Sequence, residues 1–213
     1  MKSTRCERDI WQIFGRRVRR ITRIDCQTQI IPNFVQYLRS KGVAGIGPAG
    51  GPVYVGALFA KVNGGDVGGV FLGARTSTPG GGGRFGLFYT AVPNGAASTN
   101  SAWLYGLQQN AENRTNLALI NTGEEDGNAD LFTIDLFNGD TGQKVNTIQV
   151  TLNAKSWQQF GTILSTYAAG TTQGYARIKR TSGINPFITY SVVNDGATAN
   201  ARTGDGAFVQ STP

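Results

Sequence analysis

Residues 147–152, TIQVTL, alternate polar and apolar side chains without interruption. Alternation places one set of side chains on each face of an extended chain, so this stretch predicts a β-strand with one buried face. Two earlier stretches, residues 117–121 and 129–137, predict further strands, and each is followed by a turn signal rich in Asn, Gly or Thr. The loop at residues 138–142 is therefore expected to connect a hairpin.

The rest of the C-terminal half predicts one short helix among more strands. Residues 157–167 carry apolar side chains at helical spacing, which predicts a crossover helix. Residues 174–179 and 186–193 predict two strands, and residues 207–211 add a last one. Short strands joined by Gly, Asn and Asp turns are typical of an antiparallel sandwich. The expected fold class is all-β, with a complete immunoglobulin-like β-sandwich at residues 102–213.

An internal repeat predicts a partial second copy of this unit nearer the N-terminus. Residues 86–93 resemble residues 206–213, and residues 56–62 resemble residues 174–179. We therefore expect an incomplete β-sandwich at residues 27–93. Either its N-terminal strands are missing, or the half-unit packs against the complete unit or against a second copy of the chain. Because an incomplete sandwich leaves unpaired edges, self-association is expected in the last case.

The formal net charge of +7 belongs to one end of the chain. Residues 1–45 hold ten Lys and Arg and three acidic residues, which gives the whole excess, so the remaining chain is neutral. Residues 1–26 are expected to form a basic extension, as helix or as strand. No nucleic-acid partner is expected for the neutral bulk of the chain. The small polar residues 94–101 predict a linker between the two units.

The cysteines and the apolar runs of the sequence bear on metal binding, on a disulfide and on membrane or export segments. The chain has two cysteines, Cys6 and Cys26, and no histidine, so these thiols cannot complete a typical structural zinc site. Whether they form a disulfide stays open. The first 25 residues hold no apolar run of signal-peptide length, and no segment approaches the roughly 18 apolar residues of a membrane span.

The absence of histidine excludes Ser-His-Asp and Cys-His catalysis. A pair of carboxylates could still hydrolyse glycosides. Asp130 and Asp135 have opposite parity on one predicted strand, so they are expected on opposite faces. The chain is therefore expected not to be an enzyme, and no cofactor is expected. The carboxylates available for such a pair are Asp130, Asp135, Asp195 and Asp205.

Two clusters remain as candidate binding features. The acidic turn after residue 123 offers closely spaced oxygen ligands, which calcium prefers, but it lacks the full calcium-loop pattern, so a solvated hairpin tip is favoured. The weak calcium candidates are Glu125, Asp126, Asn128 and Asp130. Five aromatic side chains could form a carbohydrate or peptide platform, although aromatics in strands more often pack in the core. These are Trp103, Tyr105, Tyr167, Tyr175 and Tyr190.

Residues 114–121, RTNLALIN, and residues 190–195, YSVVND, with residues 203–205 shortly after, resemble uncharacterised tandem β-sandwich modules of exported bacterial proteins. The likeness covers about residues 50–213 and stops before residue 27. It implies an extracellular or cell-surface setting and no known catalysis. The expected function is a non-catalytic structural or adhesion module that contacts an unknown protein or glycan at the cell surface. The alternative is a carbohydrate-binding or carbohydrate-cleaving module that uses exposed aromatics and carboxylates.

Overall fold

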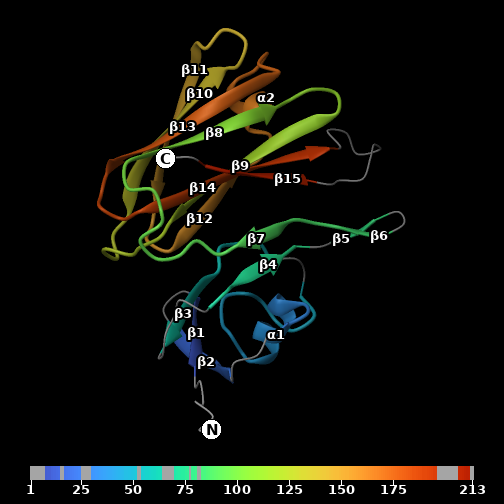
Figure 1. Ribbon diagram of the computed structural model, residues 1–213, viewed down its shortest axis with the longest axis vertical. Coiled ribbons are helices and arrows are strands. Elements are labelled where there is room, and N and C mark those ends of the chain that lie inside the picture. Colours follow the sequence, from blue (N-terminus) through green and yellow to red (C-terminus); the bar gives the residue numbers. More distant parts are fainter. Residues whose placement is uncertain are drawn as a thin grey trace, which may run out of the picture. The chain divides into compact units, whose positions relative to one another are not determined.

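The chain divides into two compact units, Met1–Phe71 and Leu72–Pro213 (Figure 1). This division falls earlier than the linker expected at residues 94–101. Cys6, Cys26 and Asp205 lie outside the residues that the structure describes. The computed structural model describes residues 8–14, 17–24, 30–51, 54–63, 70–76, 78–80, 83–195 and 206–211.

The first unit contains a three-stranded antiparallel sheet in the order β2-β1-β3. Its strands are β1 (Arg8–Phe14), β2 (Arg17–Ile24) and β3 (Phe59–Asn63). The basic stretch that the sequence left open between helix and strand is thus a hairpin. Helix α1 (Phe34–Ser40) follows β2, and the side chain of Asn33 caps it by accepting a hydrogen bond from the backbone N–H of Gln36 (3.4 Å).

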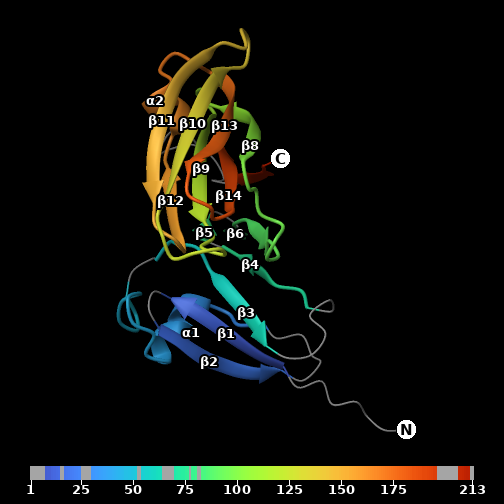
Figure 2. The same ribbon diagram turned by 90° about the vertical axis from the view of Figure 1, so that its left-hand side faces the viewer.

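The second unit is built on two four-stranded antiparallel sheets, which confirms the all-β fold class. Figure 2 shows the strands of the first sheet side by side in the order β11-β10-β13-β8. They are β8 (Ser101–Gln108), β10 (Asp130–Asn138), β11 (Lys144–Leu152) and β13 (Gln173–Ser182). The second sheet has the order β12-β9-β14-β15. Its strands are β12 (Ser156–Phe160), β9 (Asn113–Asn121), β14 (Phe187–Asp195) and β15 (Gly206–Gln210).

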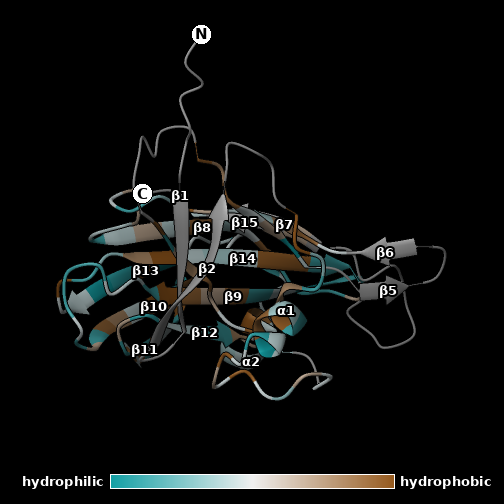
Figure 3. Cartoon of the chain, turned by 90° about the horizontal axis from the view of Figure 1, so that it is seen from below, coloured by the Kyte–Doolittle hydropathy of each residue, from teal (hydrophilic) through white to brown (hydrophobic). Residues whose placement is uncertain are grey.

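One hydrophobic core is shared by the two sheets of the second unit. The predicted strand at residues 147–152 is confirmed, because Val150 and Leu152 are buried and Ile148 packs against the same core. Phe132 of β10 and Phe187 of β14 meet edge to face across the core, with ring centroids 5.3 Å apart. Figure 3 colours much of β9 and β14 as hydrophobic, as expected for strands that face this core.

The helix predicted at residues 157–167 is only partly present. Residues Ser156–Phe160 form β12 and pair with β9, and helix α2 (Ile163–Tyr167) begins after a turn at Thr162, where φ is 45°. Phe160, Ile163 and Leu164 are all buried in the core. Apolar side chains at these positions face inward whether or not the first turn is helical, so their spacing did not reveal the strand.

Two short ribbons precede the sheets in the second unit. Strand β4 (Gly73–Arg75) pairs with β7 (Phe88–Thr90), and β5 (Thr78–Gly80) pairs with β6 (Gly83–Phe85). The two segments that suggested a repeat therefore separate, because β3 belongs to the first unit and β7 to the second. Among the residues described in both units, no helix is long and apolar enough to cross a membrane.

The segment expected as a linker is hydrogen-bonded to the second unit. Ser98 and Phe187 exchange two backbone hydrogen bonds, of 2.9 and 2.8 Å, and Ser101 already begins β8. The backbone N–H of Gly95 also donates to the carboxylate of Glu124 (3.1 Å). These contacts explain why the division of the chain lies before this segment.

Candidate binding face

Four aromatic side chains lie together on the outer face of the β11-β10-β13-β8 sheet. Their strands alternate between core and solvent: Ala102 and Leu104 of β8, and Ala176 of β13, are fully buried. The residues between them therefore point outward. We call the set formed by Trp103, Tyr105, Phe137 and Tyr175 the aromatic strip.

The rings of the aromatic strip contact one another across three strands. Phe137 and Tyr175 stack with centroids 4.8 Å apart and an interplanar angle of 2°. Tyr105 stacks on Tyr175 at 5.9 Å and on Trp103 at 6.2 Å. Offset-stacked pairs of this kind stabilise one another beyond the area that they bury. The strip is consequently a preformed and rigid feature of the sheet.

A β-bulge in β8 displays Tyr105. The register between β8 and β13 shifts between Gly174 and Ala176, and Gly106 adopts a positive φ of 72°. Leu104 and Leu107 are consequently both fully buried although they are three residues apart. The extra residue lifts Tyr105 outward, where 52% of its surface is exposed.

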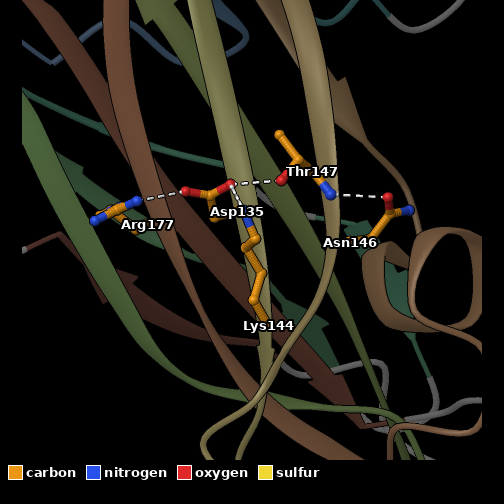
Figure 4. Close-up of polar contacts among 5 residues, drawn as sticks. All are labelled: Asp135, Lys144, Asn146, Thr147 and Arg177. Atoms are coloured by element: carbon orange, nitrogen blue, oxygen red, sulfur yellow. Dashed lines mark hydrogen bonds and ion pairs between the residues drawn. The ribbon is translucent and has the colours of Figure 1, made fainter.

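A polar cluster lies beside the strip, centred on Asp135 of β10 (Figure 4). Asp135 Oδ1 accepts a hydrogen bond from the Thr147 hydroxyl (2.6 Å) and an ion pair from Lys144 Nζ (3.5 Å). Asp135 Oδ2 accepts a hydrogen bond from Arg177 Nη2 (2.7 Å). The guanidinium of Arg177 also lies over the ring of Trp103, 5.6 Å from its centroid, which joins the polar cluster to the strip.

The environment of Asp135 keeps its carboxylate ionised. Burial by itself would raise the pKa of Asp135, but hydrogen bonds from Thr147 and Arg177 and the charges of Lys144 and Arg177 outweigh burial and lower the pKa. Asp135 therefore anchors Arg177 against Trp103, and its ionised form suits no general-acid role. Asp130 belongs to a separate network at the start of β10, so these two acids do not act as a pair.

Comparison with protein-family models, curated proteins and solved structures found no match. The resemblance to exported bacterial modules stays a prediction.

The structure brings together three of the five aromatics singled out in the sequence. Tyr167 instead packs edge to face on Phe160 (6.1 Å) against the core. Tyr190 lies on β14 in the other sheet and accepts a hydrogen bond from Trp157 Nε1 (3.3 Å). Phe137 was not singled out from the sequence. It lies two residues after Asp135 on one predicted strand, so alternation places both side chains on the same face, and this spacing could have identified it.

Tyr190 also serves to attach a neighbouring ribbon. Tyr89 of β7 packs edge to face on Tyr190, with ring centroids 5.9 Å apart. Burial raises the pKa of both phenols, and for Tyr89 the neighbouring Tyr190 adds to the effect. These aromatics therefore join the β4-β7 ribbon to the second sheet.

Hydrogen bonds close the acidic turn that was considered for calcium. Asp126 Oδ1 accepts from the Asn185 Nδ2 amide (2.7 Å) and from the backbone N–H of Asn128 (3.0 Å). Asp126 Oδ2 accepts from Asn128 Nδ2 (2.7 Å). Hydrogen bonds from Asn128, with a further one from Asn185, lower the pKa of Asp126. Asp130 accepts from the backbone N–H and from Nδ2 of Asn185 (2.8 and 3.2 Å).

Asn185 is the centre of this turn, and sequence reasoning missed it. It is fully buried, and its Oδ1 accepts the backbone N–H groups of Glu125 (3.0 Å) and Asp126 (2.9 Å). The partners of its side chain and of its backbone N–H lie 55 to 60 residues earlier, so no local pattern reveals the contact. Within the described part of the chain, no group of three or more acidic, His or Cys side chains could hold a metal ion. The turn is thus a hydrogen-bonded anchor between loops.

Proposed function

We propose that the chain is a non-catalytic adhesion or scaffolding module of the cell surface or extracellular space, and that it holds a carbohydrate on the aromatic strip. The observation that carries this proposal is the row of four contacting rings on the outer face of a sheet. An immunoglobulin-like arrangement of the sandwich belongs to the same proposal.

The surroundings of the strip favour a carbohydrate over a protein partner. A sugar ring offers a small patch of C–H groups, weakly positive, bordered by hydroxyls, and an aromatic ring offers an apolar, negatively polarised face. The half-exposed ring of Tyr105 matches such a patch. Polar side chains from the same outer face, Thr133, Thr147 and Gln149, are placed by strand alternation to meet hydroxyl groups.

The state of Asp135 supports binding without cleavage. Glycoside hydrolases use two carboxyl groups about 5 to 10 Å apart, and one of them has a raised pKa. The pKa of Asp135 is lowered instead, and its oxygens are engaged by Thr147, Lys144 and Arg177. A carboxylate in this state orients neighbouring side chains and does not protonate a leaving group.

The test measures how far the full chain migrates in native gels that contain neutral or acidic soluble polysaccharides. Binding to a polysaccharide slows this migration. We expect at least one polysaccharide to retard the chain, and Tyr105→Ala to weaken that binding about tenfold or more. Tyr105 is half-exposed, so this change leaves the core intact. Tyr54→Ala is the matched control, because Tyr54 is a 41% exposed tyrosine of the first unit.

Two results would contradict the proposal. The first is that no polysaccharide in the panel slows the migration of the chain. The other is a Tyr105→Ala variant that binds as tightly as the unchanged chain while circular dichroism shows the same fold.

A further inference from the structure

We infer that the aromatic strip selects an acidic polysaccharide, a polymer of uronic acids, over a neutral one. This inference rests on the proposed function and names its ligand class. It follows from the charges that a ligand would meet beside the strip.

The exposed charges of the polar cluster are cationic. The side chains of Lys144 and Arg177 are 51% and 40% exposed, whereas that of Asp135 is only 6% exposed. Thr147, Lys144 and Arg177 occupy the oxygens of the carboxylate, as described above. A ligand on this face would therefore meet two positive groups before it met the negative one.

Lys179 adds a third cation to the same face. It lies two residues after Arg177 on β13, with the buried Ile178 between them, so both point outward. Lys179 is exposed, and its register partners on the neighbouring strands are Thr133 and Ser101, both uncharged. The cations of this face therefore extend along β13 beyond the polar cluster.

Acidic side chains near the strip are few and engaged. Asp140 lies in the hairpin after Phe137 and accepts a hydrogen bond from Gln173 Nε2. The acidic turn with Asp126 and Asp130 lies at the start of β10, whereas Phe137 lies near its end. Apart from Asp140, the acidic turn thus lies at the other end of β10 from the strip.

Arg177 keeps hydrogen-bond donors for a carboxylate ligand. A guanidinium has five N–H donors, and Asp135 receives a bond from one nitrogen, Nη2. The Nε of Arg177 is buried, so a ligand would meet the terminal N–H groups of this 40% exposed side chain. The side chain is already held between Asp135 and Trp103, so little rotamer freedom is lost when a ligand binds. These features suit a planar carboxylate, which arginine binds in bidentate fashion.

The strip fits a uronate polymer better than a single-stranded nucleic acid. Nucleic-acid binders stack successive bases on exposed ring faces within a positively charged groove. Here Phe137 and Tyr175 cover each other, and Arg177 covers Trp103. The half-exposed Tyr105 remains as a ring for one sugar unit, but the strip offers no row of free ring faces for successive bases. Residues 72–213 also contain nine basic and nine acidic residues, so this unit has no overall positive field.

The experiment compares polymers that share one backbone. The full chain is titrated by calorimetry, at low ionic strength, with polygalacturonate and with its methyl ester, which lacks the charge. Alginate serves as a second acidic polymer, and an oligodeoxythymidylate serves as the nucleic-acid probe. We expect the acidic polygalacturonate to bind about tenfold more tightly than its ester, with the difference shrinking at high salt.

Charge-neutralising variants locate the preference. The double variant Lys144→Gln with Lys179→Gln is expected to cut the preference for polygalacturonate over its ester to about threefold or less. Lys155→Gln is the control for charge loss, because it removes one positive charge from an exposed turn between β11 and β12, off the strip. It is expected to keep the full preference.

The outcomes separate this inference from the proposed function. Equal binding of polygalacturonate and its ester, or binding of neutral polysaccharides alone, would overturn the inference and leave the proposed function standing. Failure of every polysaccharide to bind would overturn both. Tighter binding of the oligodeoxythymidylate than of any polysaccharide would overturn both in favour of a nucleic-acid ligand.

Discussion

At Gly183, the absence of a side chain makes room for Asp130. A Cβ at this position would lie 2.2 Å from Cγ and Oδ1 of Asp130, and φ is 92°. Gly183→Ala should therefore lower the free energy of unfolding by about 3 kcal/mol, because strain and a clash with a buried carboxylate add together. Urea denaturation measures the loss. Gly170→Ala is the control, since φ is 85° but no atom lies within 4 Å of its added Cβ, and about 1 kcal/mol is expected. Equal losses would contradict the role of Asp130.

Asp135 should make stability depend on pH in the acid range. Its pKa is lower in the folded chain than the ordinary value of 3.8, so its stabilising effect is present above that value. The effect is lost as the pH falls through the folded pKa. Asp135→Asn should cost about 1 to 3 kcal/mol at pH 7, measured by urea denaturation, and the cost should vanish in the most acidic buffers. A cost that does not change between pH 7 and the acid limit would show that charge is not the cause.

Trp103, Tyr105 and Tyr175 were singled out from the sequence by residue type, and only Tyr175 lies on a predicted strand. Their neighbours Phe137 and Arg177 were not linked to them. Which residues meet across strands depends on register, and here the bulge at Tyr105 and Gly106 sets the register. Residue types along one strand carry no information about that shift.

At the scale of elements, Asn185 joins the loop before β14 to the acidic turn before β10. Asn185→Ala should lower the free energy of unfolding by about 3 kcal/mol, because it removes the acceptor of two backbone N–H groups and the amide donor to Asp126 and Asp130. Thermal and urea unfolding measure the loss. Asn153→Ala, at an exposed turn, should cost less than about 0.5 kcal/mol. Similar losses in both variants would mean that Asn185 does not hold the loops together.

The type of an element could be predicted where the spacing of its apolar residues fits only one kind of structure. The prediction failed where that spacing fits both a helix and a strand. The alternation at residues 147–152 permits only a strand with one buried face, and β11 has this form. The apolar positions of residues 157–167 suit a helix, but β12 fills the edge of the second sheet beside β9, so hydrogen bonding to β9 decided the first half of the segment. Whether a segment becomes an edge strand depends on pairing with a strand that is distant in the sequence. The spacing of apolar residues within the segment does not contain that information.

At the scale of the molecule, the boundary expected at residues 94–101 rested on small polar residues, and such a composition does not determine which contacts a segment makes. Every member of the shared core lies within residues 102–187, yet the β4-β7 ribbon before them also belongs to the second unit. We therefore predict that residues 72–213 fold as an independent unit with a single cooperative transition. Residues 98–213 should also fold, because they keep the core and the pairing of Ser98 with Phe187.

The two fragments should differ in stability and in the titration of one phenol. Residues 98–213 lack Tyr89, so Tyr190 loses its edge-to-face partner, and the free energy of unfolding should fall by about 1 to 2 kcal/mol. Burial raises the pKa of Tyr190, and removing Tyr89 should bring that pKa closer to its ordinary value of 10.0. Urea denaturation and ultraviolet titration of phenolate measure the two effects, with Tyr89→Ala in residues 72–213 as the matched comparison. If residues 98–213 matched residues 72–213 in both measurements, the ribbon would not belong to the folded unit and the boundary would return to the segment before β8.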